Sequence, residues 1–536
     1  MSTTDDASSA ATTLANGNAR LGIELGSTRI KAVIVGDGEQ VLASGGFTWE
    51  NQYIDETWTY SLDAVWQGIQ QAFTAVCAAA EVNHGVHPIR FAAIGISAMM
   101  HGYLAFDQQG HQLAPFRTWR NTSTGPAAAE LTQLLDFNVP LRWSVAHLYQ
   151  AVLNGEPHLA ELDFCTTLAG YVHWRLTGRK VLGVGDASGM FPIDDATHGW
   201  DQTRLAKVDA LLAEHGVSVR VEDVFSRPLD AGADAGTLTA EGALLLDPTG
   251  RLEAGIPLCP PEGDAATGMV ATNAVAPRTG NVSVGTSIFA MVVLERPLAQ
   301  VHTEIDLVTT PAGDQVAMVH CNNGASELGS WAGLFTDFAE RIGAEADTDA
   351  IFAALLGTAL AGEPDAGGLL AFNTLAGEPI TGLTEGRPLV VRTPGSDFTL
   401  ANFMRAQVYG MFAALSIGMR TLAEEHVALD TMYAHGGVFR TAGVAQRFLA
   451  AAIDTPVAVS TTASEGGAWG VAVLASYLVS GKGRTLPAFL TEDVFASVDT
   501  QSMPATGEDV AGYQRYLEAY EAGLAAERAA VKALPS

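Results

Sequence analysis

The sequence predicts a duplicated α/β fold with two large domains. Two strand–turn–strand segments, one in each half of the chain, share a pattern: residues 21–35 contain the turn Gly-Ser-Thr, and residues 280–293 contain the turn Gly-Thr-Ser. Each segment is followed by further strand patterns and then by helical patterns, so the same order occurs twice. With 536 residues the chain is long enough to bury two large cores. We place the domain boundary near residue 276, which gives domains at 20–276 and 277–536.

Composition excludes several classes of partner. The formal net charge of −30 argues against nonspecific binding to nucleic acid or to anionic membranes. It does not exclude an anionic ligand, because turns, helix ends and Mg²⁺ set the local sign of the potential. No apolar run approaches the roughly 20 residues that are needed to span a membrane. We therefore expect neither a nucleic-acid partner nor a membrane partner.

The start of the chain and the cysteines point to the cytoplasm. Residues 1–19 are rich in Ser, Thr, Ala and Asn, and they lack the basic start and apolar core of a signal peptide, so we predict a disordered tail there. The 4 cysteines are far apart and form no Cys-x-x-Cys pair. Such cysteines are typical of reduced, buried thiols in a cytoplasmic protein.

The first half is expected to open with three strands, to continue with a long amphipathic helix and two more strands, and to end in a helical region. Leu62, Val65, Trp66, Ile69 and Phe73 lie on one face of the expected helix. The expected strands span 21–25, 29–35, 41–48, 90–97 and 103–106, and the expected helices lie at 61–80 and within 124–215.

The second half repeats this order. A helix is expected to begin at Ser326, and the last helix lies near the end of the chain. The expected strands span 281–284, 287–294, 315–320, 431–435 and 456–459, and the later helices span about 401–425, 442–453, 464–480 and 509–532.

The two Gly-hydroxyl turns are candidate phosphate-binding sites. Turns of this kind present backbone N–H groups and hydroxyls to a phosphate. Glu24 precedes Gly26 by two residues on the same strand, so both point to the same side of the sheet. A carboxylate there suits Mg²⁺ held through water. The alternative is a plain hairpin with a solvent-exposed glutamate, since Gly-Ser turns are common.

Asp264 is the candidate catalytic base. It lies in Gly263-Asp264-Ala265, where small neighbours let a substrate approach and partial burial tunes a carboxylate for proton transfer. The alternative is that Asp264 caps the helix that follows it.

Two further segments are candidate ligand sites. Met100, His101 and Gly102 follow a core strand, and ligands of α/β proteins gather at strand ends; the alternative is an interior histidine with methionine core filler. Gly436 and Gly437 also follow a strand, where bare backbone admits a flat adenine or ribose; the alternative is a tight loop. The sequence contains no Gly-x-x-x-x-Gly-Lys loop and no Gly-x-Ser-x-Gly elbow.

In their order along the chain, these segments resemble the FGGY family of carbohydrate kinases. The resemblance covers about residues 20 to 520 and implies two actin/hexokinase-like (RNase H-like) domains around an interdomain cleft. It also implies that both turns hold the ATP phosphates, that Asp264 is the base, and that the helix at 464–480 is the family's connecting helix. The segment 169–178 looks like the family's first signature region. The nucleotide-binding residues implied are Gly26, Ser27, Thr28, Gly285, Thr286, Gly436 and Gly437.

The chain departs from the family pattern in two places. The usual aspartate of the first strand is Glu24 here, and this residue is the candidate for the metal. Met100-His101-Gly102 is similar to the sugar-contacting segment of xylulokinases, but their Leu-Trp-x-Asp-x-Arg pattern is replaced by residues 118–123, Thr-Trp-Arg-Asn-Thr-Ser. Trp119 remains a candidate for the sugar site.

The resemblance predicts ATP-dependent phosphorylation of a sugar hydroxyl with Mg²⁺, and a ketopentose such as xylulose as the substrate. The alternatives are a ribulokinase or another FGGY polyol kinase and, from other classes, a catalytically silent sugar sensor or an actin-like ATPase. The partner is a small-molecule sugar, and a homodimer is among the oligomeric states left open.

Overall fold

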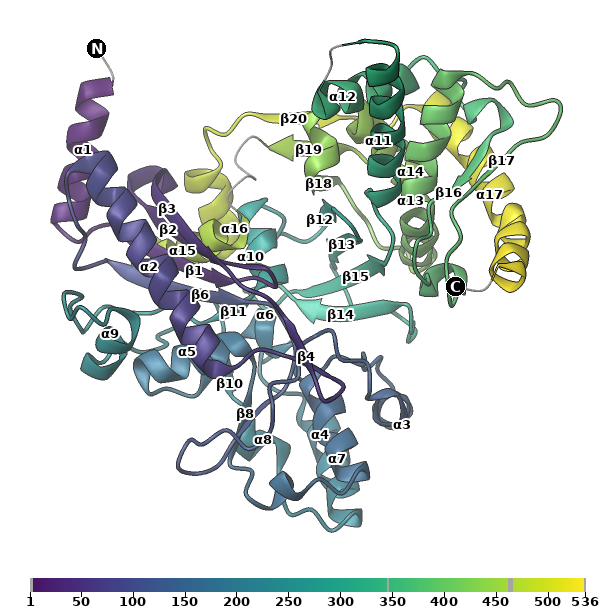
Figure 1. Cartoon of the computed structure of the whole chain (residues 1–536). Helices are drawn as coiled ribbons and strands as arrows, with labels where there is room; N and C mark the ends of the chain where they lie inside the picture. Colours follow the sequence, from purple (N-terminus) through teal and green to yellow (C-terminus); the bar gives the residue numbers. More distant parts are fainter. Residues whose placement is uncertain (1–2, 345–346, 461–465, 535–536) are drawn as a thin grey trace. The chain divides into compact units, whose positions relative to one another are not determined.

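The computed structural model describes residues 3–344, 347–460 and 466–534 (Figure 1). The chain divides into two compact units. Unit 1 comprises Met1–Ala276, Leu307–Val316 and Thr462–Val498; unit 2 comprises Pro277–Asp306, Ala317–Thr461 and Asp499–Ser536. The first break coincides with the boundary expected near 276. The later segments differ from that expectation, because the stretch 462–498 returns to unit 1 instead of staying in a continuous second domain.

Unit 1 is built on a five-stranded sheet with the order β11-β6-β1-β2-β3. The opening hairpin pairs β1 (Arg20–Leu25) antiparallel with β2 (Arg29–Val35), and β2 pairs antiparallel with β3 (Val41–Thr48). On the other side of β1, β6 (Ala93–Ala98) and β11 (Glu262–Gly263) extend the sheet in parallel. The three strands predicted at the start of the chain are therefore confirmed.

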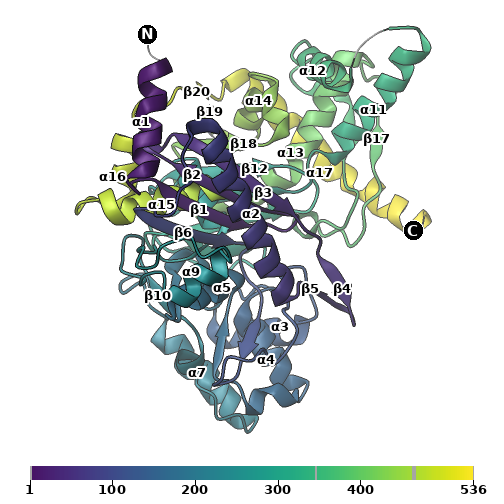
Figure 2. The same cartoon turned by 60° about the vertical axis from the view of Figure 1, so that its left-hand side comes forward.

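One helix covers each face of this sheet. Helix α2 (Leu62–His84) packs on β3 and β2, and Figure 2 shows it lying across these strands. Its start is capped by Ser61, whose hydroxyl accepts the N–H of Ala64. Helix α15 (Gly466–Ser480) packs on β1 and β6. Since side chains alternate along a strand, the Gly22 side of β1 faces α15, where a Cβ on Gly22 would meet the Ala468 carbonyl.

Residues 3–15 are helical, which differs from the disordered tail predicted at 1–19. Helix α1 spans Thr3–Ala15. Ala10 and Leu14 are buried against the hydrophobic core of unit 1, and Ala19 is buried just before β1. Polar composition misled the prediction, because a few well-spaced apolar residues are enough to dock a short amphipathic helix.

Unit 2 repeats the sheet of unit 1. Within its seven-stranded sheet, β15-β13-β12-β18-β19 follow one another, and they correspond in order to β3-β2-β1-β6-β11. The central strand β12 pairs antiparallel with β13 and parallel with β18, and β18 pairs parallel with β19. The predicted duplication is therefore confirmed by topology. The strands of unit 2 are β12 (Thr279–Val284), β13 (Ile288–Val293), β15 (Gln315–Cys321), β18 (Thr431–His435), β19 (Val457–Ser460) and β20 (Thr500–Met503). Strand β14 (Ile305–Thr309) falls mostly in the segment Leu307–Val316 of unit 1.

Long helices pack in unit 2 around α13 (Leu400–Glu424), which is buried over most of its length. Thr399 caps α13 by accepting the N–H of Asn402, and Thr506 caps α17 in the same way at Asp509. The other long helices of this unit are α11 (Ser326–Arg341), α12 (Thr348–Ala359), α14 (Val444–Ile453) and α17 (Gly507–Ala533).

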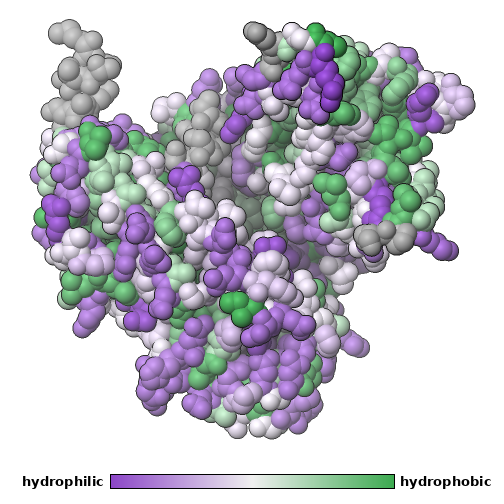
Figure 3. Space-filling view, in the orientation of Figure 1, coloured by the Kyte–Doolittle hydropathy of each residue, from purple (hydrophilic) through white to green (hydrophobic). Residues whose placement is uncertain are grey.

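The remaining elements of unit 1 are short and follow β6. Figure 3 shows mostly hydrophilic residues on the visible face over α4 and α7, as expected for an acidic chain. Within the described ranges, no helix combines the length and apolar character needed to cross a membrane. The short elements of unit 1 that follow β6 are α3 (Gly125–Leu135), α4 (Ser144–Leu153), α5 (Leu168–Thr177), α6 (Val184–Ala187), α7 (Gln202–Glu214), α8 (Val221–Val224), α9 (Ala240–Leu246), α10 (Asp264–Ala271), β7 (Leu104–Phe106) and β8 (Phe164–Thr166). The hairpin of β4 (Gln52–Ile54) and β5 (Thr57–Thr59) precedes α2.

Candidate active site

Two buried aromatic residues fasten the turn between β1 and β2. The Gly26 N–H closes the turn by donating to the Arg29 carbonyl at 3.0 Å. Trp49 Nε1 donates to the Gly26 carbonyl at 2.7 Å, and the Tyr60 hydroxyl donates to the Ser27 carbonyl at 2.5 Å. The rings of Trp49 and Tyr60 stack with their centroids 4.1 Å apart. These hydrogen bonds fix the carbonyls of Gly26 and Ser27 within the protein.

Glu24 lies against the start of α15. Its Oε2 accepts the N–H of Ala468 at 3.1 Å, and a Cβ added to Gly467 would lie 2.3 Å from its Oε1. Burial, and then the charge of Asp264, raise the pKa of Glu24 to about 7. The amide groups at a helix N-terminus stabilise a carboxylate. Glu24 is therefore a half-buried functional candidate and not the solvent-exposed glutamate of the alternative interpretation.

Asp264 is the first residue of α10, directly after β11. Its Oδ1 accepts the N–H groups of Met100 and Ala265, each at 3.0 Å. The residue in the N-cap position is Gly263, and Asp264 makes no capping bond to the second or third helical amide. Among the described residues, no donor binds Oδ2. Burial raises the pKa of Asp264, so one oxygen is oriented while the other stays free in an environment suited to a base.

Glu24 and Asp264 are two buried acids that act on each other, because the charge of Asp264 adds to burial in raising the pKa of Glu24. A divalent cation would stabilise two such carboxylates. No cluster of three or more metal-ligating side chains occurs in the described part of the chain. Mg²⁺ in kinase sites keeps several waters and is bound by one or two carboxylates together with substrate phosphates.

The Met100–Gly102 segment lies beside Asp264. His101 is buried in the left-handed region at φ 70°, and its Nδ1 lies 3.3 Å from the Gly189 carbonyl. Since a carbonyl only accepts, Nδ1 carries the hydrogen, and Nε2 is the acceptor of the neutral ring. Burial, and then the Arg142 charge, lower the pKa of His101. Gly102, also at positive φ, donates its N–H to the Arg142 carbonyl at 3.2 Å.

Two buried acids near Asp264 were missed by the sequence analysis. Glu262 accepts the N–H of Asp186 at 2.8 Å, and Asp186 accepts the Thr167 hydroxyl at 2.6 Å. Asp186 Oδ1 is buried without a partner in the described structure, and a Cβ on Gly263 would lie 3.2 Å from it. Burial raises the pKa of Asp186 to about 7, with a further contribution from Asp264. The sequence does contain a signal for Asp186, because the triplet Gly-Asp-Ala that holds Asp264 at 263–265 also occurs at 185–187.

The second turn is packed within unit 2 against the segment that leads into α11. The Gly324 N–H donates to the Thr286 carbonyl at 2.7 Å, and the Ala325 N–H donates to the Gly285 carbonyl at 2.8 Å. Because α11 begins at Ser326, the turn lies next to a helix N-terminus, which is a favourable place for a phosphate.

Gly436 lies beside the same turn. Strand β18 runs parallel to β12 and pairs His435 with Ser283. Gly436 has a φ of 128°, and a Cβ there would lie 2.1 Å from the Val284 carbonyl. Only glycine fits this position. The structure thus brings Gly285, Thr286, Gly436 and Gly437 together in unit 2, whereas Glu24, Gly26–Thr28, Met100–Gly102, Trp119 and Asp264 belong to unit 1. The predicted helix start at Ser464 and Glu465 lies outside the described residues.

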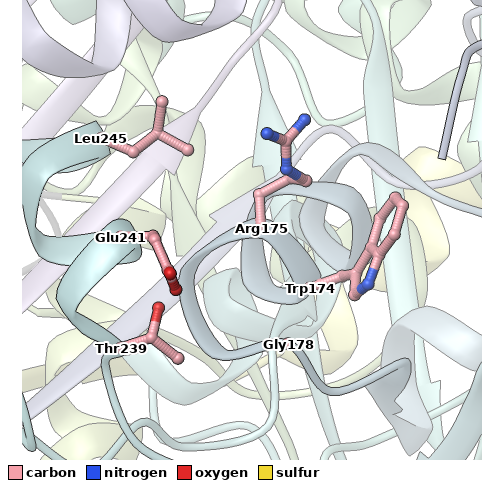
Figure 4. A pocket seen from close by; sticks show the side chains of 6 residues that line it. All are labelled: Trp174, Arg175, Gly178, Thr239, Glu241 and Leu245. Atoms are coloured by element: carbon pink, nitrogen blue, oxygen red, sulfur yellow. The ribbon is translucent and has the colours of Figure 1, made fainter. Parts of the chain in front are cut away.

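Two surface pockets of the described structure lie away from these residues. In unit 1, a pocket of about 370 Å³ lies between α5 and α9 and is lined by Trp174, Arg175 and Glu241, among others (Figure 4). In unit 2, a groove of about 510 Å³ is lined by aromatic residues of α11 and α13. Neither pocket is lined by the candidate site residues of unit 1 or by those of unit 2.

The duplicated sheets, each with a strand–turn–strand hairpin, form the two-domain actin/hexokinase-like fold. The sequence matches the N-terminal domain of the FGGY family of carbohydrate kinases over residues 19–267, and its C-terminal domain over residues 280–479. The chain therefore belongs to the FGGY family of carbohydrate kinases, which are ATP-dependent enzymes. The predicted family and fold class are confirmed.

Known proteins similar to this chain include xylulose kinases. A xylulose kinase of Escherichia coli (strain K12) is 24% identical over 299 residues, which are 53% of this chain and 57% of that protein; the match thus spans little more than half of the relative. A xylulose kinase of Lactobacillus acidophilus superposes with a TM-score of 0.76 at 15% identity, covering 95% of this chain and 98% of the other. A gluconate kinase of the same organism superposes with a TM-score of 0.76 at 16% identity and the same coverage.

Proposed function

We propose that this kinase phosphorylates a ketopentose, with Asp264 as the base. One observation carries the proposal: Asp264 has one oxygen oriented by the Met100 N–H, has the other free, and lies beside the Met100–Gly102 segment. The similarity to xylulose kinases supports the choice of sugar. A gluconate kinase with an equally similar fold makes another polyol the second candidate, and the altered segment 118–123 favours testing it.

In the proposed mechanism, Asp264 accepts the proton of the attacking sugar hydroxyl while the γ-phosphoryl group passes through a loose transition state. His101 Nε2 accepts a hydrogen bond from a second sugar hydroxyl and so orients the substrate. The turns at 26–28 and 285–287 bind the phosphates, and Gly436 and Gly437 admit the adenosine. When bound, Mg²⁺ neutralises phosphate charge, and Glu24 would hold it through water. The four cysteines are free and buried, which supports a reducing compartment such as the cytoplasm.

A sugar panel tests the proposal directly. ATP-dependent phosphorylation is measured with D-xylulose, L-xylulose, D-ribulose, L-ribulose, gluconate and glycerol. We expect the highest kcat/KM with a ketopentose. A clear preference for gluconate or glycerol would replace the proposed substrate but leave the family assignment intact.

Glu24→Gln is expected to raise the Mg²⁺ concentration needed for half-maximal activity by roughly tenfold, the lower end of what outer-shell partners of a metal contribute. The glutamine carbonyl still accepts the Ala468 N–H, so the contact with α15 is preserved. The sugar KM should change much less. Glu81→Gln, on an exposed part of α2, is the control and should leave the Mg²⁺ requirement unchanged. An unaltered requirement in Glu24→Gln would make Glu24 a structural strand residue.

His101→Asn is expected to raise the sugar KM about two- to tenfold, which corresponds to losing a net hydrogen bond of ~0.5–1.5 kcal/mol. Asparagine is chosen because it tolerates the left-handed backbone of residue 101 better than alanine does. Titration with ATP should show nearly unchanged affinity. His111→Asn on the surface is the matched control. A fall in ATP affinity equal to the rise in sugar KM would remove His101 from the sugar site.

A further inference from the structure

We propose that Trp119 is a positioning residue for the phosphate turn, and that its indole N–H orients the Ser27 hydroxyl as a donor toward the nucleotide phosphates. This inference deepens the proposed function and rests on it. It assigns the segment 118–123 an effect on the nucleotide, although that segment was expected to act on the sugar. The contact itself is direct: Trp119 Nε1 donates to Ser27 Oγ at 3.1 Å.

The segment that carries Trp119 is anchored from both sides of that residue. Asn121 is buried, and its amide bonds both backbone groups of Trp58: Oδ1 accepts the N–H at 2.8 Å and Nδ2 donates to the carbonyl at 2.8 Å. The Thr118 N–H donates to the same carbonyl at 3.2 Å. The Arg120 guanidinium lies over the Trp58 ring, 3.8 Å from its centroid. Trp119 therefore projects from a segment that is held on β5.

These contacts also explain the departure from the xylulokinase pattern. An aspartate at position 121 would keep the acceptor for the Trp58 N–H but would lose the donor for the Trp58 carbonyl. Asn121 makes both bonds, so its side chain is fully engaged within the protein. The residue type at this position thus serves the anchoring of the segment.

On the other side of the contact, the backbone of the turn is already fixed. Trp49 and Tyr60 hold the carbonyls of Gly26 and Ser27. The freedom that remains at Ser27 is the rotation of its side chain and the direction of its hydroxyl hydrogen. Because the indole can only donate, it occupies a lone pair of Ser27 Oγ and directs the hydrogen away from itself. A hydroxyl that accepts one hydrogen bond is polarised and donates a stronger one.

The experiment compares the affinity of the full chain for ATP and for adenosine by calorimetry. In Trp119→Phe, which keeps the ring and removes the N–H, we expect ATP to bind about two- to tenfold more weakly. Adenosine lacks the phosphates, and its affinity should not change. Ser27→Ala should weaken ATP binding at least as much, and Trp119→Phe should add nothing in that background.

Trp58→Phe is the matched control, because the Trp58 ring contacts Arg120 by its face. It should leave both affinities unchanged. The proposal is overturned if Trp119→Phe leaves ATP affinity intact, if it weakens ATP equally with and without the Ser27 hydroxyl, or if it changes only the sugar KM. Failure of the wild-type chain to phosphorylate any sugar would instead overturn the proposed function, since the binding comparison needs no turnover.

Discussion

Asp264→Asn is expected to lower kcat by about 10²- to 10⁴-fold, the usual contribution of a general base. The substitution keeps the shape of the side chain and the acceptor oxygen that binds the Met100 and Ala265 N–H groups. It removes the carboxylate to which we assign acceptance of the proton from the sugar hydroxyl. Binding of ATP should be nearly unchanged, because the phosphates are assigned to the turns. Initial rates with saturating sugar and ATP measure the effect.

The pH profile gives a second readout for Asp264. The base must be ionised, so activity is lost as the pH falls through its pKa. Because burial raises that pKa above the ordinary value of aspartate, the acidic limb of kcat should lie closer to neutrality than for an exposed carboxylate. Asp194→Asn is the control, since Asp194 lies in a surface loop and accepts hydrogen bonds from Thr197. A fall in kcat of less than about tenfold in Asp264→Asn would take the role of base from Asp264.

The duplicated sheet could be predicted because its signals are local. A tight Gly-hydroxyl turn between two apolar strands is visible in the sequence at both 26–28 and 285–287. Strands that are followed by helices form one layered unit, so two such series predict two units of the same fold. The same locality explains why the bounds of β1, β2 and β12 agree with expectation to within about two residues.

The place of α15 could not be predicted, because it depends on contacts between distant parts of the chain. The sequence order puts residues 466–480 in the second half, yet the helix packs on β1 and β6 of unit 1. Its apolar residues surround it on all sides, so no amphipathic face indicates which sheet it covers. Gly22 and Gly95 lie within expected strands and let a helix approach closely, but the sequence does not say which helix packs against them.

Some residues of the candidate site could be predicted from the sequence, and others could not because their roles depend on contacts between distant parts of the chain. Asp264 and His101 each follow an expected strand or apolar stretch, and Asp264 also has small neighbours, so their positions were informative without a structure. Glu262 and Asp186 became candidates only after folding, because the hydrogen bond between them joins residues 76 positions apart. The sequence analysis did not single out Trp49 and Tyr60, because only the fold shows that they hold the turn.

Gly22→Ala is expected to destabilise unit 1 by about 3 kcal/mol or more, at the upper end of the cost of overpacking a core. A Cβ on Gly22 would lie 2.1 Å from the Ala468 carbonyl oxygen and 2.8 Å from the Ala472 nitrogen. Both atoms belong to the backbone of α15, so the helix must move as a body. The Ala468 N–H then leaves Glu24, and activity should fall together with stability.

Urea denaturation followed by circular dichroism measures this loss as a lower unfolding midpoint. Gly125→Ala is the matched control in the same unit, because a Cβ there meets no atom within 4 Å. Its unfolding free energy should change by no more than about 0.5 kcal/mol. If Gly22→Ala unfolded at the midpoint of the control, the close packing of α15 on β1 would be wrong, and with it the placement of Glu24 at the helix start. A large shift in Gly22→Ala alone supports both, because that packing is what brings the start of α15 to Glu24, the candidate metal residue.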